Sequence, residues 1–194
     1  DAGPVPSYVR AETKTAFDEK YPSAKDVEWE TRNDYLVVDF KQDKVEKEAW
    51  FDNSGTWYMT ETDIPFAQLP DAVKTAFQQG EYSTWKVDDV DMIERRDVET
   101  VYVIETEQGN SEVDLYYSPD GILVKTVLDA GGNDGYEDFI PSQPSSSVDA
   151  YVKEHYPSAR ILDIDREKGV TEVEILDGTV CRELLFDDGG AWMQ

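Results

Sequence analysis

The sequence predicts an α+β fold of tandem units, each a helix followed by a four-stranded antiparallel meander, with the helices packed on one sheet face. Three repeated patterns predict it. Lys-Thr-Ala-Phe occurs at 14–17 and 74–77, and Tyr-Pro-Ser-Ala occurs at 21–24 and 156–159. An aromatic residue followed at fixed spacing by a glycine and a large apolar residue occurs at 51–57, 117–123 and 186–192. Aligning these repeats places three units near 5–65, 66–130 and 131–194.

Each unit opens with a stretch that predicts a helix. In the first, the apolar spacing from Val9 to residue 17 places one set of side chains on a single helix face. In the second, Pro70 stands near the start, where its missing N–H is tolerated, and Gly80 ends the helix. In the third, the serines at 145–147 favour an N-cap. Tyr-Pro ends the first and third helices because the residue before proline avoids the α conformation.

After each helix the apolar period changes from that of a helix to that of a strand. Short Asn-, Asp- and Gly-containing links separate the strands, so neighbours must form antiparallel hairpins. The predicted strands are 26–32, 34–41, 45–52 and 56–62 in unit one, 85–96, 100–108, 111–118 and 122–128 in unit two, and 160–167, 170–176, 179–186 and 190–193 in unit three.

Alternation along the third strand of each unit predicts which side chains face the helix. The inner set is Val45, Ala49 and Phe51, then Val113, Leu115 and Tyr117, then Val180, Leu184 and Phe186. The outer set is Glu46, Glu48 and Trp50, then Glu112, Asp114 and Tyr116, then Cys181, Glu183 and Leu185. The apolar residues just after the turns, Trp57, Leu123 and Trp192, are expected in the core.

Composition at 131–147 predicts a linker, because Gly, Pro and Ser are dense there. We therefore expect residues 1–130 to form one domain of two tandem repeats, 5–65 and 66–130. The third repeat, 148–194, is expected to be semi-independent.

The formal charge of −25 arises from 43 acidic and 18 basic residues. Such a field repels phosphate backbones and anionic lipid surfaces, which argues against nucleic acid and membrane-surface partners. The sequence has no apolar run long enough to span a membrane, so direct insertion is not expected.

Four segments, 21–25, 49–57, 69–73 and 117–121, carry a family resemblance. Through them the chain resembles the PepSY-like family of secreted Bacteroidetes proteins. It covers nearly the whole chain, most strongly 5–128, and implies a fold similar to beta-lactamase inhibitor protein and a periplasmic or lipid-anchored location. Two units are more usual in the family, and the resemblance supplies no catalytic residue.

Candidate catalytic groups are sparse, and we predict no enzymatic activity and no catalytic residue. His155 is expected at the C-terminal end of a helix, where a cation is favourable. Cys181 is expected to be a small residue on a strand. The Ser-x-x-Lys match at 83–86 lacks its companion motifs.

One loop offers a weak calcium site, since calcium binds carboxylate and amide oxygens on flexible loops. Its candidate ligands are Asp129, Asn133, Asp134, Glu137 and Asp138. No other cofactor is expected.

The outer row of the sheet offers a recognition surface. Trp50 and Tyr116 are expected there as anchors, flanked by acids, because rings amid charges are common at interfaces. The flanking acids are Glu46, Glu48, Glu112 and Asp114. Alternatively, the rings merely cover the sheet or pack on a neighbouring unit. We therefore predict a secreted, non-enzymatic binding module for an unknown protein, peptide or glycan, which requires accessible rings. The alternative is a calcium-responsive periplasmic regulator that uses the acidic loop.

Overall fold

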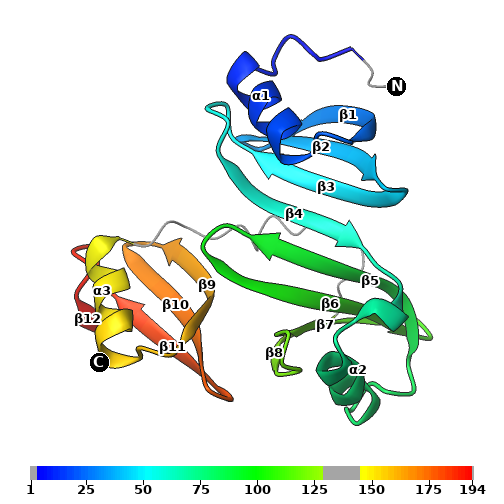
Figure 1. Cartoon of the computed structure of the whole chain (residues 1–194). Helices are drawn as coiled ribbons and strands as arrows, with labels where there is room; N and C mark the ends of the chain where they lie inside the picture. The colour runs from blue at the N-terminus through cyan, green and yellow to red at the C-terminus, as the bar shows by residue number, and fades with distance from the viewer. Residues whose placement is uncertain (1–3, 129–144, 194) are drawn as a thin grey trace.

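The computed structural model describes residues 4–128 and 145–193. Its element order is a helix followed by four strands, three times over (Figure 1). The first group is α1 (Ala11–Lys20), β1 (Lys25–Arg32), β2 (Tyr35–Gln42), β3 (Val45–Phe51) and β4 (Trp57–Asp63). A short 3₁₀ helix η1 (Phe66–Gln68) precedes α2 (Asp71–Gln78), β5 (Lys86–Arg95), β6 (Val98–Gln108), β7 (Ser111–Tyr117) and β8 (Leu123–Leu128). The third group is α3 (Ser146–His155), β9 (Arg160–Glu167), β10 (Val170–Asp177), β11 (Val180–Phe186) and β12 (Trp192–Met193).

The strands form two antiparallel sheets. Strands β1 to β8 lie side by side in chain order in one eight-stranded sheet, and β12, β11, β10 and β9 form a second sheet. The first two groups join where β4 pairs with β5, with Met59 opposite Arg95. The predicted combination of helices with antiparallel sheets is confirmed. The division of the chain into repeats, linker and domains stays a prediction.

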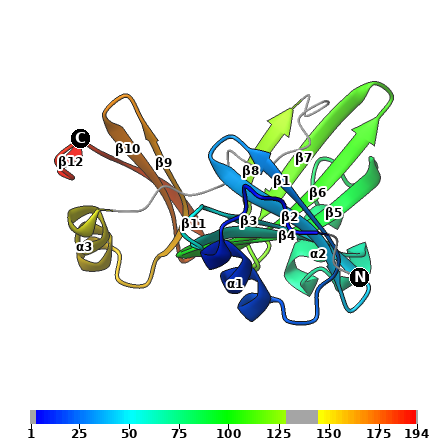
Figure 2. The ribbon, with the colours of Figure 1, turned by 90° about the horizontal axis from the view of Figure 1, so that it is seen from above.

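Each helix packs on strands of its own group through apolar side chains. Phe17 of α1 makes edge-to-face contacts with Phe40 and Phe51 at ring-centroid distances of 5.0 and 6.2 Å. Val73 and Phe77 of α2 belong to a second buried cluster with side chains of β5, β6 and β7. The third cluster joins α3 to β9, β10 and β11. The curved eight-stranded sheet carries α1 and α2 on its outer side (Figure 2).

The glycine of the repeated turn allows the turn to lie against the first turn of the helix of the same group. Gly55, Gly121 and Gly190 have φ angles of +87°, +81° and +81°. A Cβ at Gly55 would lie 2.8 Å from the carbonyl oxygen of Glu12 in α1, and one at Gly121 would overlap the carbonyl of Ala72 in α2. Only glycine satisfies both the left-handed backbone and the close approach.

The third group is held against the second by Arg95, whose side chain is fully buried. Its guanidinium donates hydrogen bonds to the carbonyl oxygens of Glu99, at 2.9 Å, and Leu162. It also lies 3.4 Å from Asp163 Oδ1. Arg160 bridges Glu99 and Asp120 across the same contact. Strand β9 therefore lies beside the β5–β6 hairpin (Figure 1).

The turn glycines predict a graded response to alanine. Gly121→Ala should lower the free energy of unfolding by about 3 kcal/mol, because it adds left-handed strain and a clash with α2. Gly109→Ala is the matched control, since Gly109 also has a positive φ but a Cβ there would meet nothing within 4 Å. It should cost about 1 kcal/mol. Urea unfolding measures both, and equal losses would contradict the turn–helix contact.

Candidate functional site

The sheet face turned away from α1 and α2 has an apolar zone and an acidic zone. The apolar zone is a buried cluster of Val37, Trp50, Met59, Ile93, Val101, Val103 and Tyr116. The register explains it, because Trp50 stands opposite Val37 and Met59, and Tyr116 stands opposite Val103. Alternation therefore places these side chains on one face, opposite the cores under the helices.

The predicted accessibility of Trp50 and Tyr116 is wrong. Trp50 is 0% exposed and Tyr116 is 4% exposed. Tyr35, Tyr58, Val124 and Val127 pack against their cluster, and the guanidinium of Arg32 lies 5.6 Å from the centre of a Trp50 ring. Alternation gives the face of a side chain but not the curvature of the sheet, and these rings lie within a packed cluster. They are core residues rather than surface anchors.

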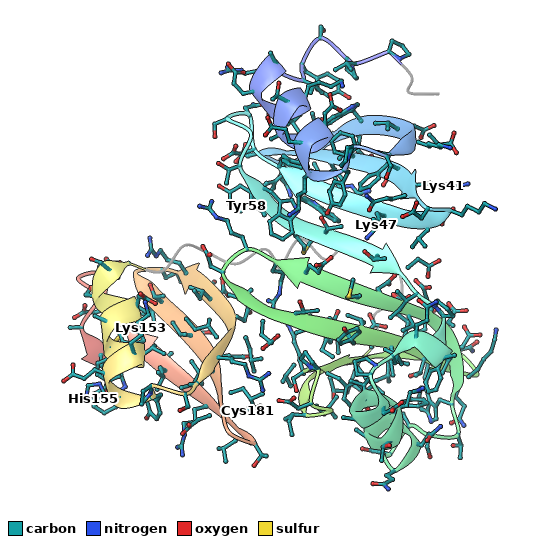
Figure 3. All side chains as sticks on the ribbon, viewed as in Figure 1. Lys41, Lys47, Tyr58, Lys153, His155 and Cys181 are labelled. Atoms are coloured by element: carbon teal, nitrogen blue, oxygen red, sulfur yellow. The ribbon has the colours of Figure 1, made fainter. Side chains whose placement is uncertain are left out.

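The acidic zone forms an open groove of about 560 Å³. Among the described residues, nine carboxylates and two lysines line it, together with Phe40. The carboxylates are Asp26, Glu28, Asp39, Glu46, Glu48, Glu61, Asp63, Asp89 and Asp91. The lysines are Lys41 and Lys47 (Figure 3). The groove therefore carries a large excess of acidic groups.

The acids are cross-strand neighbours. Glu28, Asp39, Glu48 and Glu61 face one another in sequence across β1, β2, β3 and β4. Like charges directly opposite one another destabilise a sheet. The row is therefore expected to lower its charge by binding protons or cationic groups.

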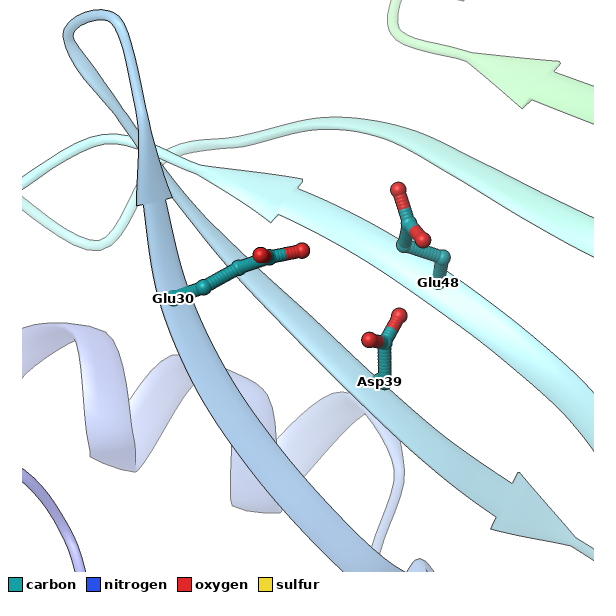
Figure 4. Close-up of side chains that lie close together, drawn as sticks. All are labelled: Glu30, Asp39 and Glu48. Carbon is teal, nitrogen blue, oxygen red and sulfur yellow. The ribbon is translucent and has the colours of Figure 1, made fainter. Parts of the chain in front are cut away.

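One cation, the guanidinium of Arg32, already binds part of the row. Arg32 donates hydrogen bonds to Glu48 Oε1 at 2.6 Å and to Glu30 Oε1 at 2.5 Å. Carboxylate oxygens of Glu30, Asp39 and Glu48 lie within 4.8 Å of one another (Figure 4). Arg32 therefore partly neutralises Glu48, the member of the row that lies two residues before Trp50 on β3.

Burial and crowding raise several carboxyl pKa values. Burial, followed by the hydrogen bond and charge of Asp39, raises the pKa of Glu48 to about 8, although Arg32 acts in the opposite direction. Burial, followed by the charges of Glu48, Asp89 and Glu105, raises the pKa of Glu61 to about 8. Burial and Asp89 also raise the pKa of Asp63. Glu48 and Glu61, in the middle of the groove, therefore lose their protons at a higher pH than ordinary carboxyl groups do.

The predicted flanking acids separate into two places. Glu46 and Glu48 line the groove. Glu112 is exposed on β7, whereas Asp114 is buried, and burial followed by the charge of Glu112 raises the pKa of Asp114 to about 6. The five predicted calcium ligands, Asp129, Asn133, Asp134, Glu137 and Asp138, lie outside the described residues.

The prediction missed groove acids on β2, β4 and β5, namely Asp39, Glu61, Asp63, Asp89 and Asp91. They continue the face of Glu46 and Glu48 across neighbouring strands. Extending the alternation from the third strand through the whole meander would have found them.

His155 and Cys181 lie on different elements of the third group (Figure 3). The ring of His155 stacks on Tyr151 at a centroid distance of 3.9 Å, and its Nδ1 lies 3.0 Å from the Tyr151 carbonyl oxygen. Cys181 is exposed on β11. Its position in the alternation sets it on the sheet face opposite Leu184 and Phe186, which pack under α3.

Helices on the outer side of a curved antiparallel sheet place the chain in the class of beta-lactamase-inhibitor-like α+β proteins. The chain belongs to the PepSY-like family, described as "putative beta-lactamase-inhibitor-like, PepSY-like", whose model matches residues 34–125 and 137–194. The resemblance is thus confirmed, as is the beta-lactamase-inhibitor-like fold that it implies. No helix among the described residues is long and apolar enough to cross a membrane.

Solved structures show the same fold. A BLIP-like protein from Bacteroides fragilis is 38% identical with a TM-score of 0.63, and the match covers 69% of this chain and 94% of that one. A DUF2874 family protein from Bacteroides ovatus is 31% identical with a TM-score of 0.62, covering 70% of this chain and 99% of that one. A Bacteroides eggerthii protein described as "putative periplasmic" is 22% identical with a TM-score of 0.60, covering 63% and 90%, and shows the fold alone. No curated protein matches the chain.

The raised carboxyl pKa values predict that stability falls as pH rises. A folded-state pKa above the unfolded value means that the folded chain binds more protons, so the free energy of unfolding decreases between about pH 4.5 and pH 8. Glu61→Gln removes one such group and should be more stable than the original chain at pH 9 by about 1–3 kcal/mol. The advantage should shrink at pH 5.

Urea unfolding at pH 5, 7 and 9 measures this difference. Glu19→Gln, which changes an exposed acid of α1, is the control and should track the original chain. A Glu61→Gln advantage that is the same at every pH would contradict the assignment.

Proposed function

We propose that this protein is a non-enzymatic binding module whose acidic groove holds a basic segment of a protein or peptide. The groove itself carries the proposal, since among the described residues nine carboxylates and two lysines form a concave, predominantly acidic surface. Complementary charge steers partners and sets the register of binding. A net charge of −25 extends the same field over the whole molecule.

The raised pKa values add a physical driving force. A cation near Glu48 or Glu61 favours the ionised form, so a basic partner displaces protons rather than meeting a permanently charged site. The partner also relieves repulsion between acids that already face one another across the strands. Binding should therefore release protons near neutral pH.

The absence of enzymatic activity is part of this proposal. The inhibitor-like description of the family supports it. The groove is lined by Asp, Glu, Lys and Phe among the described residues, and neither His155 nor Cys181 lines it. We also propose that the protein acts in the periplasm or outside the cell. A lipid anchor is compatible with this location. The resemblance to secreted proteins supports that location.

We further infer that the three helix-plus-four-strand groups are copies of one unit with its helix on one sheet face. The equivalent glycines at 55, 121 and 190 support this inference, as does a register shift at the same place in two groups, between Trp50 and Phe51 and between Tyr116 and Tyr117. The copies act as scaffold, since only the first two contribute to the face that carries the groove.

Binding of a labelled penta-lysine peptide, followed by fluorescence anisotropy, tests the groove. The variant with Glu46→Gln, Asp63→Asn and Asp89→Asn should bind about tenfold more weakly or worse, because it removes three charges from the groove. The control carries Glu19→Gln, Glu154→Gln and Glu167→Gln, which remove equal charge from exposed positions elsewhere. Equal losses in both variants would mean that only net charge attracts the peptide, and would overturn the proposal.

A calcium-responsive regulator is the second candidate. Carboxylate oxygens of Asp63, Asp89 and Asp91 lie within 4.8 Å of one another, and calcium binds several oxygens at once. The predicted loop ligands from Asp129 to Asp138 remain a separate proposal for the same function.

Thermal unfolding with and without about 1 mM calcium tests this candidate, a concentration suited to weak extracellular sites. Calcium should raise the melting temperature of the original chain more than magnesium does. Asp63→Asn with Asp89→Asn should remove the rise if the groove triad binds, and Asp129→Asn with Asp134→Asn should remove it if the loop binds. No calcium-specific rise in the original chain would eliminate the candidate.

A further inference from the structure

The eight-stranded sheet ends at β8, whose only strand neighbour among the described residues is β7. Two large apolar side chains of this edge strand reach solvent, with Leu123 45% and Leu128 63% exposed. Unpaired edges are templates for further strands unless charge or geometry blocks them.

The other edge of the sheet carries more of this protection than β8 does. Strand β1 carries alternating charges over Lys25–Arg32 and a positive φ of 53° at Asp26. Strand β8 has the sequence Leu-Val-Lys-Thr-Val-Leu, with Lys125 as its single charge. Charged edges discourage pairing, whereas apolar ones favour it.

Strand β4 shows what belongs beside β8. The two strands hold the same place in their groups, since Thr60 and Thr126 face Ala49 and Leu115, and Thr62 and Leu128 face Lys47 and Val113. Beside β4 lies β5, paired antiparallel. Thr60 is 0% and Thr62 is 4% exposed, whereas Thr126 and Leu128 are exposed. Among the described residues, no strand fills the equivalent position beside β8.

A groove of about 520 Å³ opens at that position. Its lining combines the end of α2 and the following loop with one face of β7 and β8, namely Ala76, Gly80, Glu81, Tyr82, Tyr117, Gly121, Leu123, Thr126 and Leu128. Apolar side chains from an added strand would enter it at every second residue, because alternate residues of a strand share a face.

We propose that β8 accepts an extended segment of another polypeptide, paired antiparallel as β5 pairs with β4, with alternate apolar side chains in this groove. Main-chain hydrogen bonds supply affinity in this mode and the groove supplies selectivity. A second copy of the chain is a poor occupant, because each copy carries a charge of −25. Glu81 at the rim favours a basic residue at one end of the segment. This surface is distinct from the acidic groove.

The test uses a labelled nine-residue peptide of alternating valine and threonine with lysine at both ends, followed by fluorescence anisotropy. The original chain should bind it, and hydrogen exchange should show new protection at residues 123–128. Leu128→Glu should weaken binding about tenfold or more. It does so although it adds a negative charge that attracts the lysines.

Val180→Glu is the matched control, since Val180 is 48% exposed on β11 of the other sheet, and it should leave affinity unchanged. Both positions are exposed, and circular dichroism verifies that both variants fold. Tighter binding by Leu128→Glu, protection outside β8, or no binding at about 1 mM peptide would overturn the proposal. Concentration-dependent dimers that Leu128→Glu abolishes would overturn it in favour of a second copy.

Discussion

Every strand of the eight-stranded sheet serves two faces at once, because successive side chains point to opposite sides. One face must be apolar to hold α1 and α2, and Phe51 and Leu115 meet that need. The residues that alternate with Phe51 and Leu115 along their strands therefore point to the other face. There the same alternation gathers Trp50 and Tyr116 into a second core and gathers acids from five strands into one groove.

This arrangement places closely spaced acidic side chains next to a packed core. Glu48 lies two residues before Trp50 on β3 and points to the same side of the sheet. Arg32 contacts both the carboxylate of Glu48 and the indole ring of Trp50. Raised carboxyl pKa values are the expected response, since a proton costs less there than an unpaired buried charge. The acidic groove thus lowers the stability of the fold at high pH and gathers negative charge in one place. This combination is more typical of a binding surface than of a scaffold.

Local patterns in the sequence predicted the elements well and the surfaces less well. Helix ends at Tyr-Pro and turns at glycine depend on neighbouring residues alone, and they were placed correctly. The face of Trp50 also follows from alternation, but its burial depends on sheet curvature, which no local pattern carries. Leu123 and Trp192 were expected in the core and are exposed, because Leu123 lies on an edge strand and Trp192 on the terminal strand of its sheet.

More of the acidic groove could have been predicted from the sequence. The register across β2, β3 and β4 follows from short hairpin links, and it would have placed Asp39, Glu61 and Asp63 on the same face as Glu48. The raised pKa values of Glu48 and Glu61 could not have been predicted, because they depend on how far each carboxyl is buried away from water.

The contacts of Arg95 determine which residues of the third group can be substituted without loss of its attachment. Two acceptors of Arg95 are main-chain carbonyls, those of Glu99 and Leu162. A carbonyl is present whatever side chain the residue bears, so substitutions at position 162 leave that hydrogen bond available. This part of the attachment therefore tolerates substitution at position 162, whereas Arg95, Arg160 and Asp163 contribute through their side chains. Selection can reshape the surface of the third group without detaching it from the rest of the molecule.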